Sequence, residues 1–126
     1  MKAVLGTILG LGASFVVNYA IILLFMPIDA SVDMADPVAL AEALKNFTAF
    51  DYMVQLAARI FGLLAGLLAA RAICKTSTLP IIIIMTLHMA ATVLNLFSLP
   101  HPVWFAVLDI IVPLLMFIPF LKRYKR

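Results

Sequence analysis

The sequence predicts an all-α fold: a four-helix transmembrane bundle with up-down topology and a short interfacial helix in the first outer loop. Apolar residues make up 66% of the 126 residues and charged residues only 12%, whereas soluble domains are nearer to one half apolar and one quarter charged. Charged residues and prolines divide the chain into four apolar stretches, each close to the roughly 20 residues that cross a bilayer core. A chain of this length forms a single domain, residues 1–126.

The four apolar stretches cover residues 3–26, 52–73, 79–99 and 103–121. The first is longer than the about 7–15 apolar residues of a secretory signal, so we interpret it as a retained transmembrane helix. In the first outer loop, Asp36-Pro37 indicates a helix start, because Asp caps free amides and Pro suits the first helical position. Leu40, Leu44 and Phe47 follow at helical spacing. This stripe predicts a short amphipathic helix on the outer membrane surface.

The positions of Lys and Arg predict the orientation. If the helices alternate in direction, Lys2, Arg71 and Lys75 lie on one side of the membrane, and most acidic residues lie on the other. The positive-inside rule then places both termini in the cytoplasm, with the chain as a multi-pass membrane protein. The net charge of +3 is concentrated after the fourth stretch, at Lys122, Arg123, Lys125 and Arg126. We expect this basic end to contact anionic membrane lipid, and we expect no nucleic-acid partner.

Small residues recur at four-residue spacing in the first two helices. The first helix carries Gly6 and Gly10, and the second carries Gly62 and Gly66. Residues of this size allow helix backbones to approach closely, which is how helices associate in lipid. The pattern predicts helix packing, either within one chain or between protomers.

Polar side chains inside the predicted spans form the candidate site. At 1.5 Å per residue, Arg59 lies ~10 Å below the outer interface and Asp109 about 9 Å below it. Neither charge is expected to face lipid alone, because each costs roughly 2.5–3.5 kcal/mol at depth. We therefore predict an inward-facing polar cluster in the outer half of the bundle, formed by Asn18, Arg59, His88, Asn95 and Asp109.

Two interpretations of the Arg59 and Asp109 charges stay open. The two residues could neutralise each other and fix helix register, or they could belong to a ligand-binding site or a proton-coupled pathway. In an up-down bundle, the second and fourth helices are expected to face each other diagonally. A direct contact would then require the long Arg59 side chain to cross the core.

The sequence gives no indication of a metal site, a cofactor or an enzyme. His88 and His101 lie in different environments with no carboxylate at ligand spacing, and Cys74 is the single cysteine. No nucleophile elbow, phosphate loop or dinucleotide fingerprint is present. We predict no catalytic residues, no metal and no cofactor.

Aromatic residues gather near the predicted outer interface. They are Phe50, Tyr52, Phe97, Trp104 and Phe105. Because aromatic rings are enriched at headgroup level, we interpret this group as an aromatic belt facing the interface.

The segment from Asn95 to Phe105, with Pro102-Val-Trp104-Phe105 and then Asp109, resembles a family of small uncharacterised bacterial four-helix integral membrane proteins. That family has a glycine-rich first helix, an acidic outer loop and an Asn…Pro-x-Trp-Phe…Asp signature. Where its second helix often carries a histidine, this chain has Arg59. The resemblance implies the fold and the topology, and it implies no activity.

These observations favour a small oligomeric binding or transport module with an intramembrane polar cluster. A chain of 126 residues encloses little volume alone, so we expect a homo-oligomer or a larger membrane complex as the assembled state. The alternative is an accessory or structural subunit that packs against a larger membrane complex through its glycine faces.

Overall fold

The protein is all-α, as predicted. A computed structural model describes residues 1–26, 32–33 and 35–122. Its helices are α1 (Lys2–Phe25), α2 (Pro37–Lys45), α3 (Ala49–Ile73), α4 (Leu79–Ser98) and α5 (Val103–Lys122), and the described residues contain no strand. The helices α1, α3, α4 and α5 are long and apolar enough to cross a membrane. The predicted class, an integral membrane protein built on a four-helix bundle, is therefore confirmed.

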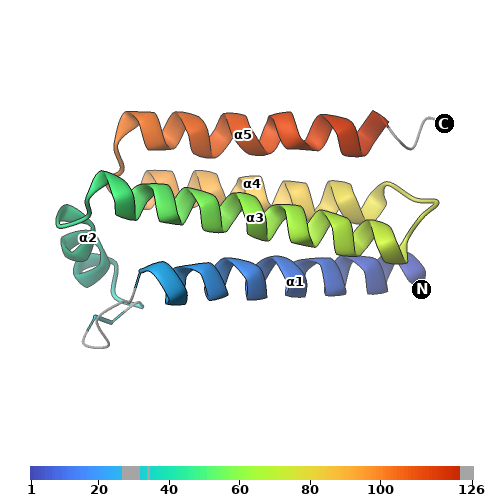
Figure 1. Ribbon diagram of the computed structural model, residues 1–126, viewed down its shortest axis with the longest axis horizontal. Helices are drawn as coiled ribbons and strands as arrows, with labels where there is room; N and C mark the ends of the chain where they lie inside the picture. The colour runs from blue at the N-terminus through green and yellow to red at the C-terminus, as the bar shows by residue number, and fades with distance from the viewer. Residues whose placement is uncertain (27–31, 34, 123–126) are drawn as a thin grey trace.

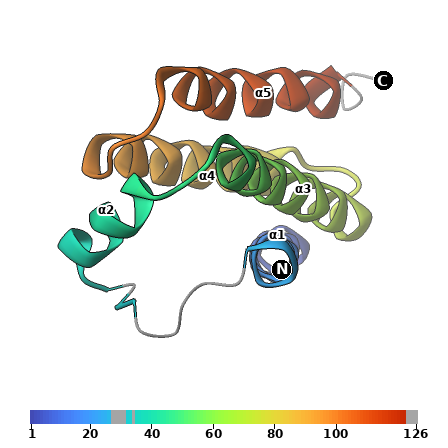
Figure 2. The same cartoon turned by 60° about the vertical axis from the view of Figure 1, so that its left-hand side comes forward.

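The four long helices lie side by side and alternate in direction. Both termini lie at one end of the bundle, and α2 lies at the other (Figure 1). We call these ends the terminal end and the α2 end. The helices α3 and α4 lie in the middle, with α1 on one side and α5 on the other (Figure 2). The expectation that the second and fourth helices face each other diagonally is wrong, because α3 and α5 are in direct contact.

Local hydrogen bonds explain where α2 and α3 begin. Asp36 caps α2 by accepting a hydrogen bond from the amide of Val38 at 2.9 Å, and Pro37 is the first helical residue. A reciprocal capping box opens α3: the amide of Thr48 donates to Oδ2 of Asp51 at 2.7 Å, and the amide of Asp51 donates to the Thr48 hydroxyl oxygen at 3.4 Å. The helix therefore begins three residues before the predicted start at 52.

The short helix α2 packs on the end of the bundle. Its Leu44 is 4% exposed and belongs to an apolar cluster with Tyr52, Leu56 and Phe105. The Tyr52 hydroxyl donates a hydrogen bond to the Leu44 carbonyl oxygen at 3.4 Å, while Glu42 is exposed. The predicted stripe thus turns Leu44 toward protein rather than lipid, because the aromatic residues at the α2 end offer it an apolar surface.

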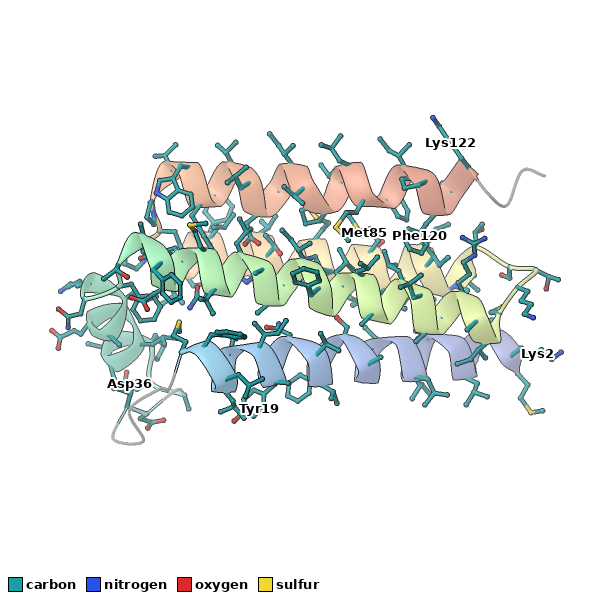
Figure 3. The ribbon with its side chains drawn as sticks, viewed as in Figure 1. Lys2, Tyr19, Asp36, Met85, Phe120 and Lys122 are labelled. Carbon is teal, nitrogen blue, oxygen red and sulfur yellow. The ribbon has the colours of Figure 1, made fainter. Side chains whose placement is uncertain are left out.

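The core consists of two apolar clusters at different levels of the bundle. The cluster at the α2 end contains Leu44, Tyr52, Leu56 and Phe105. The cluster toward the terminal end contains Leu63, Leu67, Ala70, Ile81, Ile84, Met85 and Phe120. Met85 of α4 and Phe120 of α5 lie close together there (Figure 3). Arg59, His88 and Asp109 of the candidate site lie between residues of the two clusters along α3, α4 and α5.

Candidate functional site

The predicted packing glycines all lie between α1 and α3. A Cβ atom added to Gly66 would lie 2.7 Å from the carbonyl oxygen of Gly10, and one added to Gly62 would lie 3.0 Å from the Asn18 Cβ. A Cβ on Gly6 would lie 3.3 Å from the Ala70 carbonyl oxygen. The close approach brings the Asn18 side chain of α1 onto α3, beside Gly62. The sequence predicted that these glycines pack either within one chain or between protomers. The contacts described here are all within one chain.

Arg59 of α3 and Asp109 of α5 form an ion pair. Nη1 of Arg59 donates a hydrogen bond to Oδ2 of Asp109, 50 residues further along the chain. The Asp109 side chain is 0% exposed, whereas the Arg59 side chain retains 19% exposure. The Phe105 ring covers the guanidinium, with its centroid 5.5 Å from Cζ. The arginine can therefore be reached from outside the protein, while its carboxylate partner cannot.

The ion pair lies between the two apolar clusters. On α3, Arg59 falls between Leu56 of one cluster and Leu63 of the other. On α5, Asp109 falls between Phe105 and Phe120, and on α4 the buried Thr92 and the half-buried His88 fall between Leu96 and Met85. We call the set Arg59, His88, Thr92 and Asp109 the polar layer. Its position explains how a charged pair is kept from water at both ends of the bundle.

Several buried polar atoms at or near this layer have no hydrogen-bond partner among the described residues. They are Oδ1 of Asn18, Oε1 of Gln55, Nε2 of His88 and Oδ1 of Asp109. A buried polar atom without a partner costs about 1–3 kcal/mol. The three oxygens are hydrogen-bond acceptors, and the role of Nε2 depends on the imidazole tautomer. A bound polar molecule could supply the missing partners.

The predicted cluster is only partly assembled into one network. Asn95 is half-buried on α4, and no hydrogen bond or ion pair links its side chain to Arg59 or Asp109 within the described chain. Gln55, Thr92 and Phe105 were not predicted as members. Phe105 precedes Asp109 by one helical turn, and Thr92 follows His88 by one turn, so helical spacing could have indicated both.

An aromatic group closes the α2 end above the ion pair. The His101 and Phe105 rings stack with centroids 5.1 Å apart, and the Tyr52 ring lies 5.2 Å from that of Phe105. Nδ1 of His101 lies 2.9 Å from the Leu99 carbonyl oxygen. Burial lowers the pKa of the His101 imidazole below its usual range. We call the set Tyr52, His101, Trp104 and Phe105 the aromatic cap.

The prediction of an aromatic belt at the lipid interface is wrong for Tyr52 and Phe105. Phe50 and Phe97 are exposed, as a belt requires, with 62% and 88% of their surface accessible. Tyr52 and Phe105 are 6% and 0% exposed and belong to the core. The helical positions of these two rings turn them toward Leu44 and the neighbouring helices instead of the lipid interface.

The basic residues at the terminal end are described only in part. Lys2, Arg71, Lys75 and Lys122 lie there, with Lys2 and Lys122 at opposite sides of the bundle (Figure 3). Arg123, Lys125 and Arg126 of the predicted lipid-contacting end lie outside the described residues, as does Pro27 of the first outer loop. Within the described ranges, no group of three His, Cys, Asp or Glu side chains could hold a metal ion.

Comparison of the chain with protein-family models, curated proteins and solved structures finds no match. The functional argument therefore depends on the bundle and on the geometry of the polar layer.

Proposed function

We propose that this protein is a small oligomeric membrane module that binds, and in its assembled form transports, a small polar species at the polar layer. We place it in the bacterial inner membrane with both termini in the cytoplasm, as a member of the four-helix family that its sequence resembles. The observation that carries this proposal is the Arg59–Asp109 pair between two apolar clusters, with polar atoms around it that have no hydrogen-bond partner in the described part of the chain.

The unpartnered atoms favour binding over a purely structural role. A neutralised ion pair could fix helix register by itself, but replacing such a pair by apolar residues is often neutral or stabilising. Oδ1 of Asp109 and Nε2 of His88 add a further desolvation cost that helix register does not require. A bound polar molecule or a proton would offset this cost, and ionisable groups within the membrane are most often functional.

The glycine faces are not available for the accessory-subunit alternative. It relied on glycine faces that pack against a larger complex, yet Gly6, Gly10, Gly62 and Gly66 are occupied by contacts between α1 and α3. Gly12 has nothing within 4 Å of its added Cβ position. One isolated glycine provides little close helix contact, so the glycine faces do not support the accessory-subunit alternative.

Two measurements on the full chain in detergent test the proposal. The mass of the particle isolated from native membranes should be a multiple of the 13.8 kDa chain, without larger subunits. Equilibrium dialysis against radiolabelled amino acids, sugars, organic acids and inorganic ions should reveal at least one class that binds. Arg59→Gln should remove that binding, whereas Arg71→Gln in the same helix should retain it. Absence of binding by every class would overturn the proposal, and so would larger subunits that co-purify with the chain.

A further inference from the structure

We infer that Arg59 and Asp109 form an exchangeable pair that binds a small monovalent anion together with one proton. This inference rests on the proposed function and names the class of species that the polar layer accepts. In the resting state the guanidinium holds the Asp109 carboxylate. In the loaded state it holds the incoming anion, and Asp109 carries the proton.

The pair has hydrogen-bonding atoms that its own contact does not use. The hydrogen bond from Arg59 to Asp109 uses Nη1 and Oδ2 only. Oδ1 of Asp109 is buried with no hydrogen-bond partner among the described residues, so it can take a proton without losing an existing contact. A guanidinium has five N–H donors, and the remaining donors of Arg59 lie on a side chain that is 19% exposed.

The side chains of Arg59 and Asp109 differ in exposure, and this difference determines which of the two residues contacts the ligand. Asp109 is 0% exposed, so a cation larger than a proton cannot contact its carboxylate directly. The Arg59 side chain keeps 19% exposure, and the Phe105 ring covers one face of its guanidinium, with the ring centroid 5.5 Å from Cζ. Edge-on approach suits a planar carboxylate or a compact inorganic ion. The accessible member of the pair is thus the one that attracts anions.

Charge balance requires the proton. An anion that takes the guanidinium away from Asp109 would leave a buried carboxylate without a counter-charge, which the membrane interior strongly disfavours. One proton from solvent, bound at Oδ1, removes that charge. One anion and one proton therefore enter together and leave together. The proton leaves a hydronium ion, so one O–H bond of that ion breaks as the O–H bond of Asp109 forms. Arg59, Asp109 and the bound anion together remain electrically neutral.

Other titratable groups face this layer and must be separated from Asp109 in the test. They are Tyr52 on α3, His88 on α4 and His101 in the loop before α5. His88 is the strongest competitor for the proton, because its Nε2 is also buried without a hydrogen-bond partner in the described chain. The variant His88→Gln separates the two candidates, since it removes the imidazole and leaves Asp109 intact.

The experiment measures anion binding and proton uptake on the full chain in detergent. Radiolabelled chloride and radiolabelled lactate serve as probes in equilibrium dialysis, and a pH indicator in weakly buffered solution records protons taken up on anion addition. We expect one proton per bound anion and an affinity that weakens about tenfold per pH unit as the pH rises. Preference for lactate or for chloride distinguishes an organic from an inorganic ligand.

The variants give distinct expected results. Arg59→Gln should lose binding of both probes, and Asp109→Asn should bind the anion without proton uptake and without pH dependence. His88→Gln and the exposed control Glu42→Gln should keep one proton per anion. The proton count of the unsubstituted protein keeps the test decisive even where Asp109→Asn does not fold.

Four results would overturn the inference. Anion binding without proton uptake, or loss of the proton in His88→Gln, would remove the exchange at Asp109 while leaving the proposed binding function intact. Arg59-dependent binding of cations or neutral solutes, but of no anion, would do the same. Absence of binding by any solute class would end the proposed function and this inference together.

Discussion

The ring of Phe105 lies 5.5 Å from the guanidinium carbon of Arg59, and Asp109, one turn further along α5, accepts a hydrogen bond from the same guanidinium. Residues four apart on a helix share a face, so α5 presents an aromatic face and a carboxylate to one cation. A desolvated cation–π contact contributes about 2 kcal/mol. Loss of Asp109 therefore leaves Arg59 with its aromatic contact but without its counter-charge.

The first prediction concerns the coupling between these two charges. Asp109→Asn should lower the free energy of unfolding by roughly 3–5 kcal/mol, because it leaves a largely buried guanidinium uncompensated. The double variant Arg59→Gln with Asp109→Asn should recover much of that loss, since neither charge remains. Thermal and chemical unfolding of the single and double variants in detergent measures the coupling directly.

Strictly additive losses in that cycle would show that the two residues stabilise the fold independently. The control is the double variant Arg71→Gln with Asp109→Asn, because Arg71 lies at the terminal end of the same helix. Residues that far apart should show additive effects within about 0.5 kcal/mol.

The second prediction concerns the contact between α1 and α3. Gly66→Ala should destabilise the protein by about 1–3 kcal/mol, the usual effect of overpacking, because its Cβ would lie 2.7 Å from the Gly10 carbonyl oxygen and 2.9 Å from the Ser14 Cβ. Gly12→Ala is the matched control, since nothing lies within 4 Å of the added atom. Helix propensity alone should make it stabilising by up to about 1 kcal/mol. Equal effects of the two substitutions on unfolding would contradict the close approach.

The sequence was sufficient to predict the helices and the level of the two charges. Apolar length identified the four long helices, and Asp36-Pro37 located the start of α2. Counting 1.5 Å per residue placed Arg59 and Asp109 at equal depth with opposite sign, and the structure joins them by a hydrogen bond. These properties depend on local spacing, which a single sequence contains.

The arrangement of the helices and the orientation of the rings could not be predicted in the same way. Which helices become neighbours depends on how closely each pair can approach, and the Gly10 and Gly66 contact draws α1 onto α3 and away from α5. Phe105 was interpreted as an interface residue, because an aromatic ring near a helix end suits either lipid headgroups or a core. Leu44 and Tyr52 pack around Phe105 in the folded protein, and this packing places the ring in the core.

The third prediction concerns pH and His101. Burial lowers the pKa of this imidazole in the folded protein, whereas the imidazole pKa in the unfolded chain is about 6.5. As the pH falls below that value, the unfolded state takes up a proton that the folded state resists, so the free energy of unfolding decreases. Chemical unfolding in detergent at several pH values should show this decrease between about pH 7 and pH 5. In His101→Gln the decrease should be smaller, and an unchanged pH dependence would rule out His101 as its source.

The last prediction concerns orientation in the membrane. Cys74 would be the natural labelling site for the loop between α3 and α4, but only 4% of its surface is exposed, so slow labelling there would not distinguish burial from location. Thr76 in the same loop and Asn46 at the end of α2 are both exposed and uncharged. Replacing either by cysteine leaves the charge asymmetry of the loops intact.

In a Cys74→Ala background, Thr76→Cys should react with an impermeant thiol reagent only after the cells are permeabilised, because Arg71 and Lys75 favour the cytoplasmic side. Asn46→Cys should react in intact cells. The reverse pattern would place both termini outside, and the charge asymmetry would then not determine how this bundle is inserted.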